Sequence, residues 1–462
     1  MNLLETFIEI ISLWRPTFTK KQSFVRAAQH CLAALCLCGR KTITQLISVL
    51  GQDQQDWSAH YKLYSKRNWE EKKLFQPIIE NALPLATGNF IHIAVDDTKI
   101  RKTGRKIPST SWQRDPLGPP FQVNLIWAQR FLHFSMLLPL YNDSEEDVAP
   151  RSIPIRFTDA PSVKKPGKKA TKEQIDDWKK ERKERNLSTL FLEEMKGVRT
   201  SLDQAGAKDK VALIVADGSF CNRICMNMDI DRVEMVARCK KNAKLCFPAS
   251  DDSRRFYDEH KFTPEQIRQD ANISWKKEKI FHGGRWRNVE YKEMKNVLWQ
   301  GGTKRRPLRL IVLRPVRYRV TKKGRAYYRQ PAYLLCTEVT SEVKEIIQAY
   351  FDRWQIEVNH REQKSIIGVG EAQVRSKRSV DRQPALLVAA YSALLLSSVL
   401  LYGDKMNAEM KSSIPKWYKT SKRPSCRQLV AQLRKELLTL PEKEANWAKI
   451  LSTERFVEKI AA

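Results

Sequence analysis

Residues 342–367 read EVKEIIQAYFDRWQIEVNHREQKSII, a stretch that contains neither Pro nor Gly. Its apolar residues recur at the spacing of an amphipathic helix and are Val343, Ile346, Ile347, Phe351, Trp354 and Val358. Thr340 or Ser341 is expected to cap this helix, and Gly368 and Gly370 are expected to end it. The pattern predicts one long helix whose apolar side packs against a core.

The polar side of this helix carries a regular set of functional groups. Tyr350, Arg353, Glu357 and Lys364 stand at offsets of zero, three, seven and fourteen residues. At about 100° per residue, the four side chains fall within roughly 60° of one another. One carboxylate therefore lies between two cations and a phenol. The alternative interpretation is an ordinary amphipathic helix whose solvent-facing side happens to be charged.

This spacing resembles the Y-R-E-K signature of DDE transposases of the bacterial insertion-sequence kind, in the group called IS-four-like. The resemblance covers residues 90–364 in layout, although only short motifs within it match in detail. It implies an RNase H-like catalytic core in which Glu357 is the third catalytic carboxylate. It also implies that Tyr350, Arg353 and Lys364 grip the DNA end, a track that Arg375 extends.

Composition indicates a polyanionic partner. The 462 residues include 83 Lys and Arg against 52 Asp and Glu, which gives a net charge of +31. Nucleic acid is the simplest partner for such an excess. A basic protein of the membrane surface is the rival, but neither an amphipathic anchor nor a lipidation signal is recognisable. Double-stranded DNA is therefore the expected partner, with no membrane involved.

Cysteine usage favours a reducing compartment. Nine Cys, an odd number without CxxC pairs or an export signal, indicate reduced thiols in a cytoplasm. The resemblance implies that this is a bacterial cytoplasm, where the protein would associate with the nucleoid. Cys36 and Cys38 with His30, or Cys221 with Cys225, could suggest zinc. Because no second half-site follows either group at zinc-finger spacing, buried thiols are favoured.

Residues 385–402 form an uncharged run of eighteen residues that is long enough to be a membrane-span candidate. The run follows Pro384, contains three Ser and a Tyr, and lies between basic segments. A helix buried on all sides within a large α/β domain has the same composition. We expect the buried helix.

The N-terminal residues 1–85 are predicted to form an all-helical DNA-binding domain. Two short helical patterns are separated at Gly51 and suggest a helix-turn-helix. Asn68 is expected to cap the next helix. The aromatic residues Trp57, Tyr61 and Tyr64 are candidates for the core. The basic residues Lys62, Lys66 and Arg67 are candidates for phosphate contacts.

Residues 90–239 are predicted to form the first part of the RNase H-like core, so that the fold is α/β. FIHIAVDD is a strand that ends in two acids, and residues 121–129 and 131–140 are expected to form two strands joined at Arg130. Residues 150–185 are expected to be a polar insertion. A helix (187–202), a strand (211–220), a short helix (221–228) and a strand (232–240) then follow.

The remaining chain is divided by the length of the next connection. Asp217 to Glu357 spans 140 positions, which is too long for a single crossover. Residues 240–330 are therefore predicted to be a mostly β insertion domain. Residues 331–403 return to the core with the catalytic helix, and residues 404–462 form a helical tail.

Several acidic residues are candidates for the metal ligands that phosphodiester cleavage requires. Two Mg²⁺ ions about 4 Å apart, with Mn²⁺ able to substitute, need several hard oxygen ligands. The candidates are Asp96 or Asp97, Asp217, and Glu357. Asp217-Gly218-Ser219 has the form Asp-any-Ser/Thr, and Asp96-Asp97-Thr98 repeats that form only if Asp96 is the ligand. Asp96 is therefore preferred, with a strand-end turn residue as the alternative role.

The predicted function is cut-and-paste transposition. The protein would bind terminal inverted repeats and target DNA and act as a homodimer in a synaptic complex. The alternatives are a catalytically silent, transposase-derived DNA-binding protein and an RNase H-like nuclease or resolvase. Resemblance further implies a hairpin intermediate, with Trp286 or Trp299 as an exposed platform for a displaced base.

Overall fold

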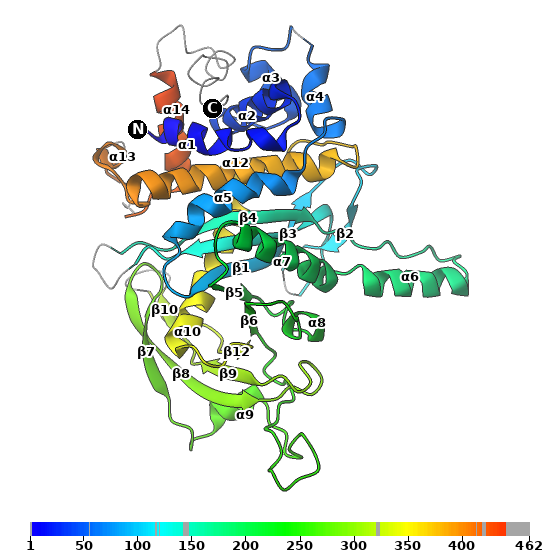
Figure 1. Ribbon diagram of the computed structural model, residues 1–462, viewed down its shortest axis with the longest axis vertical. Coiled ribbons are helices and arrows are strands. Elements are labelled where there is room, and N and C mark those ends of the chain that lie inside the picture. Colours follow the sequence, from blue (N-terminus) through cyan, green and yellow to red (C-terminus); the bar gives the residue numbers. More distant parts are fainter. Residues whose placement is uncertain are drawn as a thin grey trace.

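The computed structural model describes residues 2–54, 56–115, 118–119, 121–141, 147–319, 324–412, 414–417 and 422–439. A mixed sheet runs through the middle of the molecule, with helices on both faces (Figure 1). The end of the predicted tail, from residue 440 onward, lies outside the described residues. The strands are β1 (Phe90–Arg101), β2 (Thr110–Arg114), β3 (Leu125–Leu138), β4 (Arg151–Asp159), β5 (Val211–Ala216), β6 (Val233–Arg238), β7 (Lys276–Phe281), β8 (Trp286–Val297), β9 (Leu308–Leu313), β10 (Arg317–Arg319), β11 (Ala326–Tyr328) and β12 (Ala332–Cys336).

The central strands have the order β4-β3-β1-β5-β6. β5 runs parallel to β1 and β6 runs parallel to β5, while β3 is antiparallel to β1 and to β4. Parallel neighbouring strands must be joined by crossover connections. In the chain, α7 (Leu187–Gln204) precedes β5 and α8 (Arg223–Met226) follows it. This mixed arrangement of strands and helices confirms the α/β fold class that the sequence predicts.

Three predictions about the first strands are wrong. β3 is one continuous strand through Arg130, because β2 pairs with its first half and β4 with its second. β4 is a mostly buried strand inside the segment predicted to be a polar insertion. β1 does not end at its two acids but continues to Arg101, because β3 accompanies it that far. Its parallel partner β5 stops at Ala216, so the acids still lie where that pairing ends.

The predicted insertion contains the expected strands, but these strands join the central sheet. β12 pairs with β6 on one side and with β9 on the other, and β8 and β7 extend the sheet further. All six residues of β9 are buried, which requires a neighbour on each side and a covered face. Only β10 and β11 form a separate two-stranded hairpin.

The predicted long helix is divided in two. α10 (Val343–Asp352) and α11 (Trp354–Ser365) meet at Arg353, where the Ile356 amide donates to the Arg353 carbonyl three residues back. The tighter turn interrupts the α-helical ladder without Pro or Gly. Glu342 is the N-cap and makes no side-chain capping bond, so neither Thr340 nor Ser341 caps the helix. Gly368 and Gly370 follow α11 with positive φ angles, as expected for a chain reversal.

The second face of the sheet is covered by helices from both ends of the chain. α12 (Ser379–Tyr402) packs against β4 on one side and against α1 and α2 on the other. Within the described residues, α12 alone is long and apolar enough to cross a membrane, and 83% of its apolar window is buried in this packing. The other covering helices are α1 (Leu3–Ser12), α2 (Lys21–Cys36), α5 (Gln76–Ala82) and α14 (Cys426–Leu438).

The N-terminal helices share one hydrophobic core with α12, α14 and the sheet. α3 (Ile43–Val49) and α4 (Ser58–Ser65) are the two short helices that the sequence predicted. Tyr64 is buried, whereas Trp57 and Tyr61 are exposed and do not belong to the core. Asn68 caps no helix, because a 3₁₀ turn that begins at Glu71 precedes α5.

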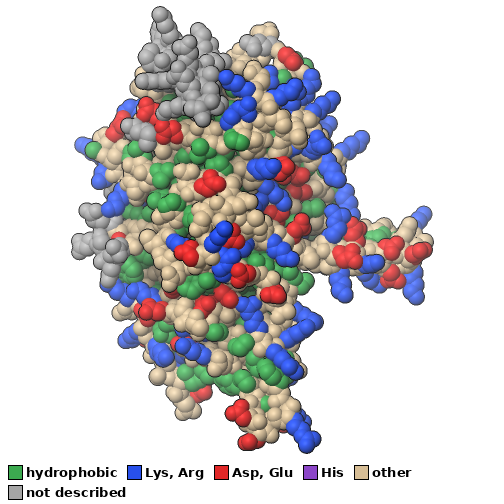
Figure 2. Space-filling view, viewed as in Figure 1, with side chains coloured by type: hydrophobic (Ala, Val, Ile, Leu, Met, Phe, Trp, Pro, Cys, Tyr) green, Lys and Arg blue, Asp and Glu red, His purple; other side chains and the backbone are tan. Residues whose placement is uncertain are grey.

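Two features of the surface bear on partners. Lys and Arg side chains are spread over the whole face seen in Figure 2 rather than gathered in one patch. The helix α6 (Lys172–Glu184) projects from the body and has no buried residue, as expected for a solvated segment (Figure 1). Of the cysteines considered as zinc ligands, Cys36 and Cys225 are buried and Cys38 is exposed.

Candidate active site

Asp96 lies on the sheet face that α11 covers. Two residues earlier on the same face, Ala94 packs against Ile356 of α11. The Nδ1 atom of His360, also from α11, lies 3.9 Å from an Asp96 carboxylate oxygen. Strand alternation turns Asp97 to the opposite face. The structure therefore brings Asp96, rather than Asp97, towards the helix that carries Glu357.

Asp97 shares Asp217 and Lys364 with Asp96 as charged neighbours but also lies near two further cations. Desolvation raises its pKa, and the nearby cations Arg130 and Lys99 act in the opposite direction. Its backbone N–H donates to the Asp96 Oδ1 at 2.8 Å, which helps to fix the orientation of that carboxylate. The contacts of Asp97 are those of a residue that supports its neighbour from the other side of the strand.

Asp217 follows the last residue of β5 and comes close to Asp96. The Ser219 backbone N–H and hydroxyl both donate to the Asp217 Oδ1, at 2.9 and 2.6 Å, and hold the carboxylate in a turn. Burial raises the pKa of Asp96 to about 7, and the negative charge of Asp217 contributes to this shift while Arg353 opposes it. The two carboxylates are therefore close enough to interact, near the point where the pairing of the central strands β1 and β5 ends.

Glu357 is held by the arginine one turn before it. The Arg353 Nη2 donates to the Glu357 Oε1 at 2.9 Å. The other two nitrogens of the guanidinium, Nε and Nη1, are buried and have no hydrogen-bond partner among the described residues. Buried N–H groups without acceptors are costly, so a ligand oxygen at this position would be stabilised.

The carboxylates suit a divalent cation by chemistry, although they are not gathered into a closed cluster. Within the described parts of the chain, no group of three His, Cys, Asp or Glu side chains is close enough to hold a metal ion. Asp96 and Asp217 nevertheless supply hard oxygen donors, and their mutual repulsion is the kind that a cation relieves. Glu357, the third predicted carboxylate, has its Oε1 occupied by the hydrogen bond from Arg353.

The remaining predicted residues lie around this pair. Lys364 is exposed, and its pKa is lowered by desolvation against the opposing effects of Asp96, Asp115 and Asp97. It therefore lies near the carboxylates. Arg375 is exposed in the segment after α11. Tyr350 does not point to the acids but lines a cavity beside Arg353.

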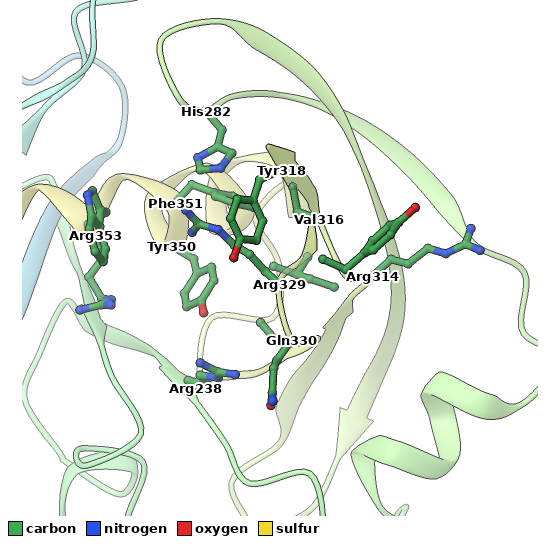
Figure 3. A pocket seen from close by; sticks show the side chains of 14 residues that line it. Arg238, His282, Arg314, Val316, Tyr318, Arg329, Gln330, Tyr350, Phe351 and Arg353 are labelled. Carbon is green, nitrogen blue, oxygen red and sulfur yellow. The ribbon is translucent and has the colours of Figure 1, made fainter. Parts of the chain in front are cut away.

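This cavity of about 640 Å³ opens next to Arg353 and is shown in Figure 3. Its walls come from β6, β9, the β10–β11 hairpin and α10, and none of its described lining residues is acidic. The combination of cations and aromatic rings suits an anionic, planar ligand. The cations are Arg238, Arg314, Arg329 and Arg353, and the aromatic residues are Tyr318, Tyr328, Tyr350, Phe351 and Trp354, with His282 at the edge.

The structure does not support the two tryptophans that the sequence suggested as an exposed platform. Trp286 is half-buried against Phe281, and its indole N–H donates to Asp147. Trp299 packs onto the core and covers Gly302, where a Cβ atom would overlap its ring. Two of the exposed rings at the cavity are instead those of Tyr318 and Tyr328. Sequence reasoning missed them because they lie in a short hairpin without a clear alternating pattern.

Comparison with known families assigns most of the chain to one family. The model of the DDE superfamily endonuclease family matches residues 15–306, which is more than half of the chain and includes Asp96 and Asp217. No curated protein matches significantly. DDE endonucleases act on DNA, and their catalytic domains generally use divalent metal ions. The chain belongs to the family of DDE superfamily endonucleases.

Proposed function

We propose that this protein is a DNA transposase, which cleaves DNA at terminal inverted repeats and joins the freed ends to target DNA. One observation carries the proposal. Asp96 and Asp217 come directly after the last paired residues of β1 and β5, and Asp96 lies on the face of β1 that packs against the helix carrying Glu357. The Y-R-E-K spacing on that helix supports a transposase of the insertion-sequence kind over a general nuclease.

The proposed metal ligands are Asp96, Asp217 and Glu357. A pair of Mg²⁺ or Mn²⁺ ions bound there would activate the attacking hydroxyl and offset charge at phosphorus. Arg353 is suited to hold a phosphate, because its Nε and Nη1 groups lack acceptors. Lys364, beside the carboxylates, adds a point charge on the same strand.

The cavity beside Arg353 supports the proposed hairpin step. A hairpin requires a sharp backbone bend and a nucleotide turned out of the stack. The guanidinium of Arg238 and the ring of Tyr350 reach the cavity from different elements, so that phosphate and base could be bound together (Figure 3). A base stacked on an aromatic ring gains roughly 1–3 kcal/mol.

The N-terminal helices are the proposed readers of the terminal repeat. Trp57 and Lys66 are exposed at opposite ends of α4, as needed for contacts to DNA. The protein would act as a homodimer on two repeat ends, in the bacterial cytoplasm and associated with the nucleoid. Arg375, together with the basic segment around it, would extend the track for the DNA end.

The test is a cleavage and joining assay with the full-length protein. A plasmid carrying two terminal repeats is incubated with Mg²⁺, with Mn²⁺ or with EDTA, and nicked, excised and joined products are followed. The proposal predicts metal-dependent nicks at the repeats followed by joining, and no products from Asp217→Ala. Binding without nicking would identify a silent DNA-binding protein. Nicking without joining would identify a nuclease or resolvase.

A further inference from the structure

The β2–β3 end of the sheet exposes an unusual group of large apolar side chains. Trp112 is 55% exposed, Leu125 56%, Val123 71% and Phe121 89%. Four such residues within one hairpin exceed the scattered exposure expected on a protein surface. We call these four residues the aromatic face.

The strand register places part of this group on one side of the hairpin. Trp112 pairs with Trp127, and Arg114 pairs with Leu125, so these four side chains point the same way. The guanidinium of Arg105 lies 4.4 Å from the ring centre of Trp112 and 4.9 Å from that of Trp127. Arg105 thereby holds Trp112 in place, while more than half of Trp112 stays open to solvent.

The surroundings of the aromatic face are cationic. Arg101, Arg105 and Arg114 are exposed around it. The acid at its edge, Asp115, accepts a hydrogen bond from the Arg101 Nη2 at 2.7 Å. This rim of arginines attracts a polyanion, whereas it would repel the same rim on a second copy of the chain.

The aromatic face is also close to the candidate active site. Asp115 is among the charges that act on Lys364, which itself lies beside Asp96. Lys99, three residues after Asp96 on β1, links the two regions, because its Nζ donates to the Arg114 carbonyl at the end of β2 at 2.9 Å. A DNA strand leaving the carboxylates past Lys364 would meet the aromatic face next.

We infer that the aromatic face binds unpaired bases of the DNA next to the cleavage position, by stacking on Trp112 and Phe121 between phosphate contacts to the arginines. This inference rests on the proposed function, from which DNA is taken as the ligand. It concerns a surface distinct from the cavity beside Arg353, since no residue of the aromatic face lines that cavity. Stacking tolerates any base sequence, so the face would recognise strand separation rather than sequence.

The test measures binding in EDTA, so that it does not depend on cleavage. Full-length protein is titrated with a 30-nucleotide single strand and with the matching duplex, each carrying 2-aminopurine. Trp112→Ala and Phe121→Ala should each weaken single-strand binding by roughly tenfold and reduce the fluorescence change. Duplex affinity should change less than twofold. Trp417→Ala removes another exposed tryptophan outside this face, and should leave both affinities unchanged.

Three results would overturn the inference. Equal loss for single strand and duplex would mean that the face contacts DNA without distinguishing unpaired bases. Unchanged single-strand binding by both variants would show that no base stacks there. A loss of dimer in light scattering, with DNA binding intact, would identify a second copy as the occupant. Because Phe121 is almost fully exposed, its replacement reports on binding even if Trp112→Ala does not fold. A failure of repeat cleavage would overturn the proposed function without altering these binding results.

Discussion

The guanidinium of Arg353 is bonded to the carboxylate of Glu357 at 2.9 Å across the break between α10 and α11. The residue proposed to hold DNA thus also holds a residue proposed to bind metal. A phosphate bound to Nε and Nη1 of Arg353, which have no acceptor, would offset the charge of the guanidinium and weaken its hold on the Glu357 carboxylate. Arrival of DNA and completion of the metal site are coupled in this arrangement.

This coupling predicts that DNA strengthens metal binding. In the absence of DNA, Arg353→Gln should bind Mn²⁺ about threefold more tightly than the unchanged protein, because a partly exposed ion pair no longer competes for Glu357. Calorimetric titration with Mn²⁺ measures this. Adding repeat DNA should strengthen binding in the unchanged protein and much less in the variant. Identical affinities in all four samples would show that Arg353 and Glu357 do not exchange partners.

The carboxylates predict a separation of cleavage from binding. Asp217→Ala or Glu357→Gln should abolish nicking of a repeat-bearing plasmid. DNA affinity should stay within about twofold, because removing a negative charge from a cationic protein does not weaken its attraction to phosphates. Gel shifts and a nicking time course measure the two properties. Robust cleavage by either variant would exclude that residue from the site.

The two neighbouring acids of β1 supply a matched pair. Asp96→Ala should be inactive, since Asp96 shares a face with Ala94 and α11. Asp97→Ala should retain cleavage at a reduced rate, because the Asp97 backbone N–H, rather than its side chain, contacts Asp96. An inactive Asp97→Ala with an active Asp96→Ala would reverse the assignment.

Local patterns predicted much of the fold. The helix of residues 187–202 and the strand beginning at Phe90 were recognisable because apolar residues, which are buried in the fold, recur along each segment. The continuity of β3 was not recognisable, since Arg130 looks like a turn residue until its pairing with Lys99 is known. Likewise, the predicted insertion strands join the central sheet through the pairing of β12 with β6, two segments that are far apart in the sequence.

The candidate site shows the same division. The Asp-any-Ser/Thr form and the alternation of side chains along β1 favoured Asp96 over Asp97. The structure gives the reason, because α11, which carries Glu357, packs on the face of β1 that includes Asp96. The break at Arg353 had no signal, because no Pro or Gly marks it. The cavity was also missed, since Arg238, Tyr318 and Tyr350 come from separate elements and meet only in the folded chain.

A buried acid at the start of α12 predicts a pH-dependent stability. Burial, with the nearby Asp159 and Glu71, raises the pKa of Asp381 to about 7, well above its value of about 3.9 in an unfolded chain. The folded state therefore favours the protonated form. Its contribution to stability is complete below about pH 4 and is lost as the pH rises through 7.

Asp381→Asn removes this titration. The variant should be more stable than the unchanged protein at pH 8 by about 1–2 kcal/mol, a value reduced to allow for partial exposure, and nearly equal at pH 4.5. Thermal or urea unfolding at both pH values measures the difference. Asp251→Asn changes an exposed aspartate and serves as the control. A stability gain that is the same at both pH values would contradict the assignment.

The N-terminal helices predict a measurable salt dependence. If Lys66 at the end of α4 contacts a phosphate, Lys66→Ala in the full-length protein should lower the slope of log affinity against log salt by about 0.9. Lys411 is exposed on α13 (Ala408–Ser412), away from α4 in the sequence, and Lys411→Ala is the matched control. Equal slopes for Lys66→Ala and the unchanged protein would remove α4 from the DNA interface.

The cavity beside Arg353 predicts which step of cleavage is sensitive to it. Nicking needs no bent strand, whereas a hairpin needs a bend that is held by contacts to a phosphate and a displaced base. Arg353→Ala and Tyr328→Ala should therefore slow hairpin formation roughly tenfold while changing the first nick much less. An end-labelled repeat, sampled over time for nick, hairpin and excised product, separates the steps.

The same hairpin offers a matched control for this last prediction. Tyr327 is next to Tyr328 on β11 and is 47% exposed, but it does not line the cavity. Tyr327→Ala should leave the ratio of hairpin to nick unchanged. If Tyr328→Ala and Tyr327→Ala slowed the hairpin equally, the effect would come from loosening the β10–β11 hairpin rather than from a lost stacking partner. If the unchanged protein formed no hairpin at all, the cavity would have to bind the DNA end in another way.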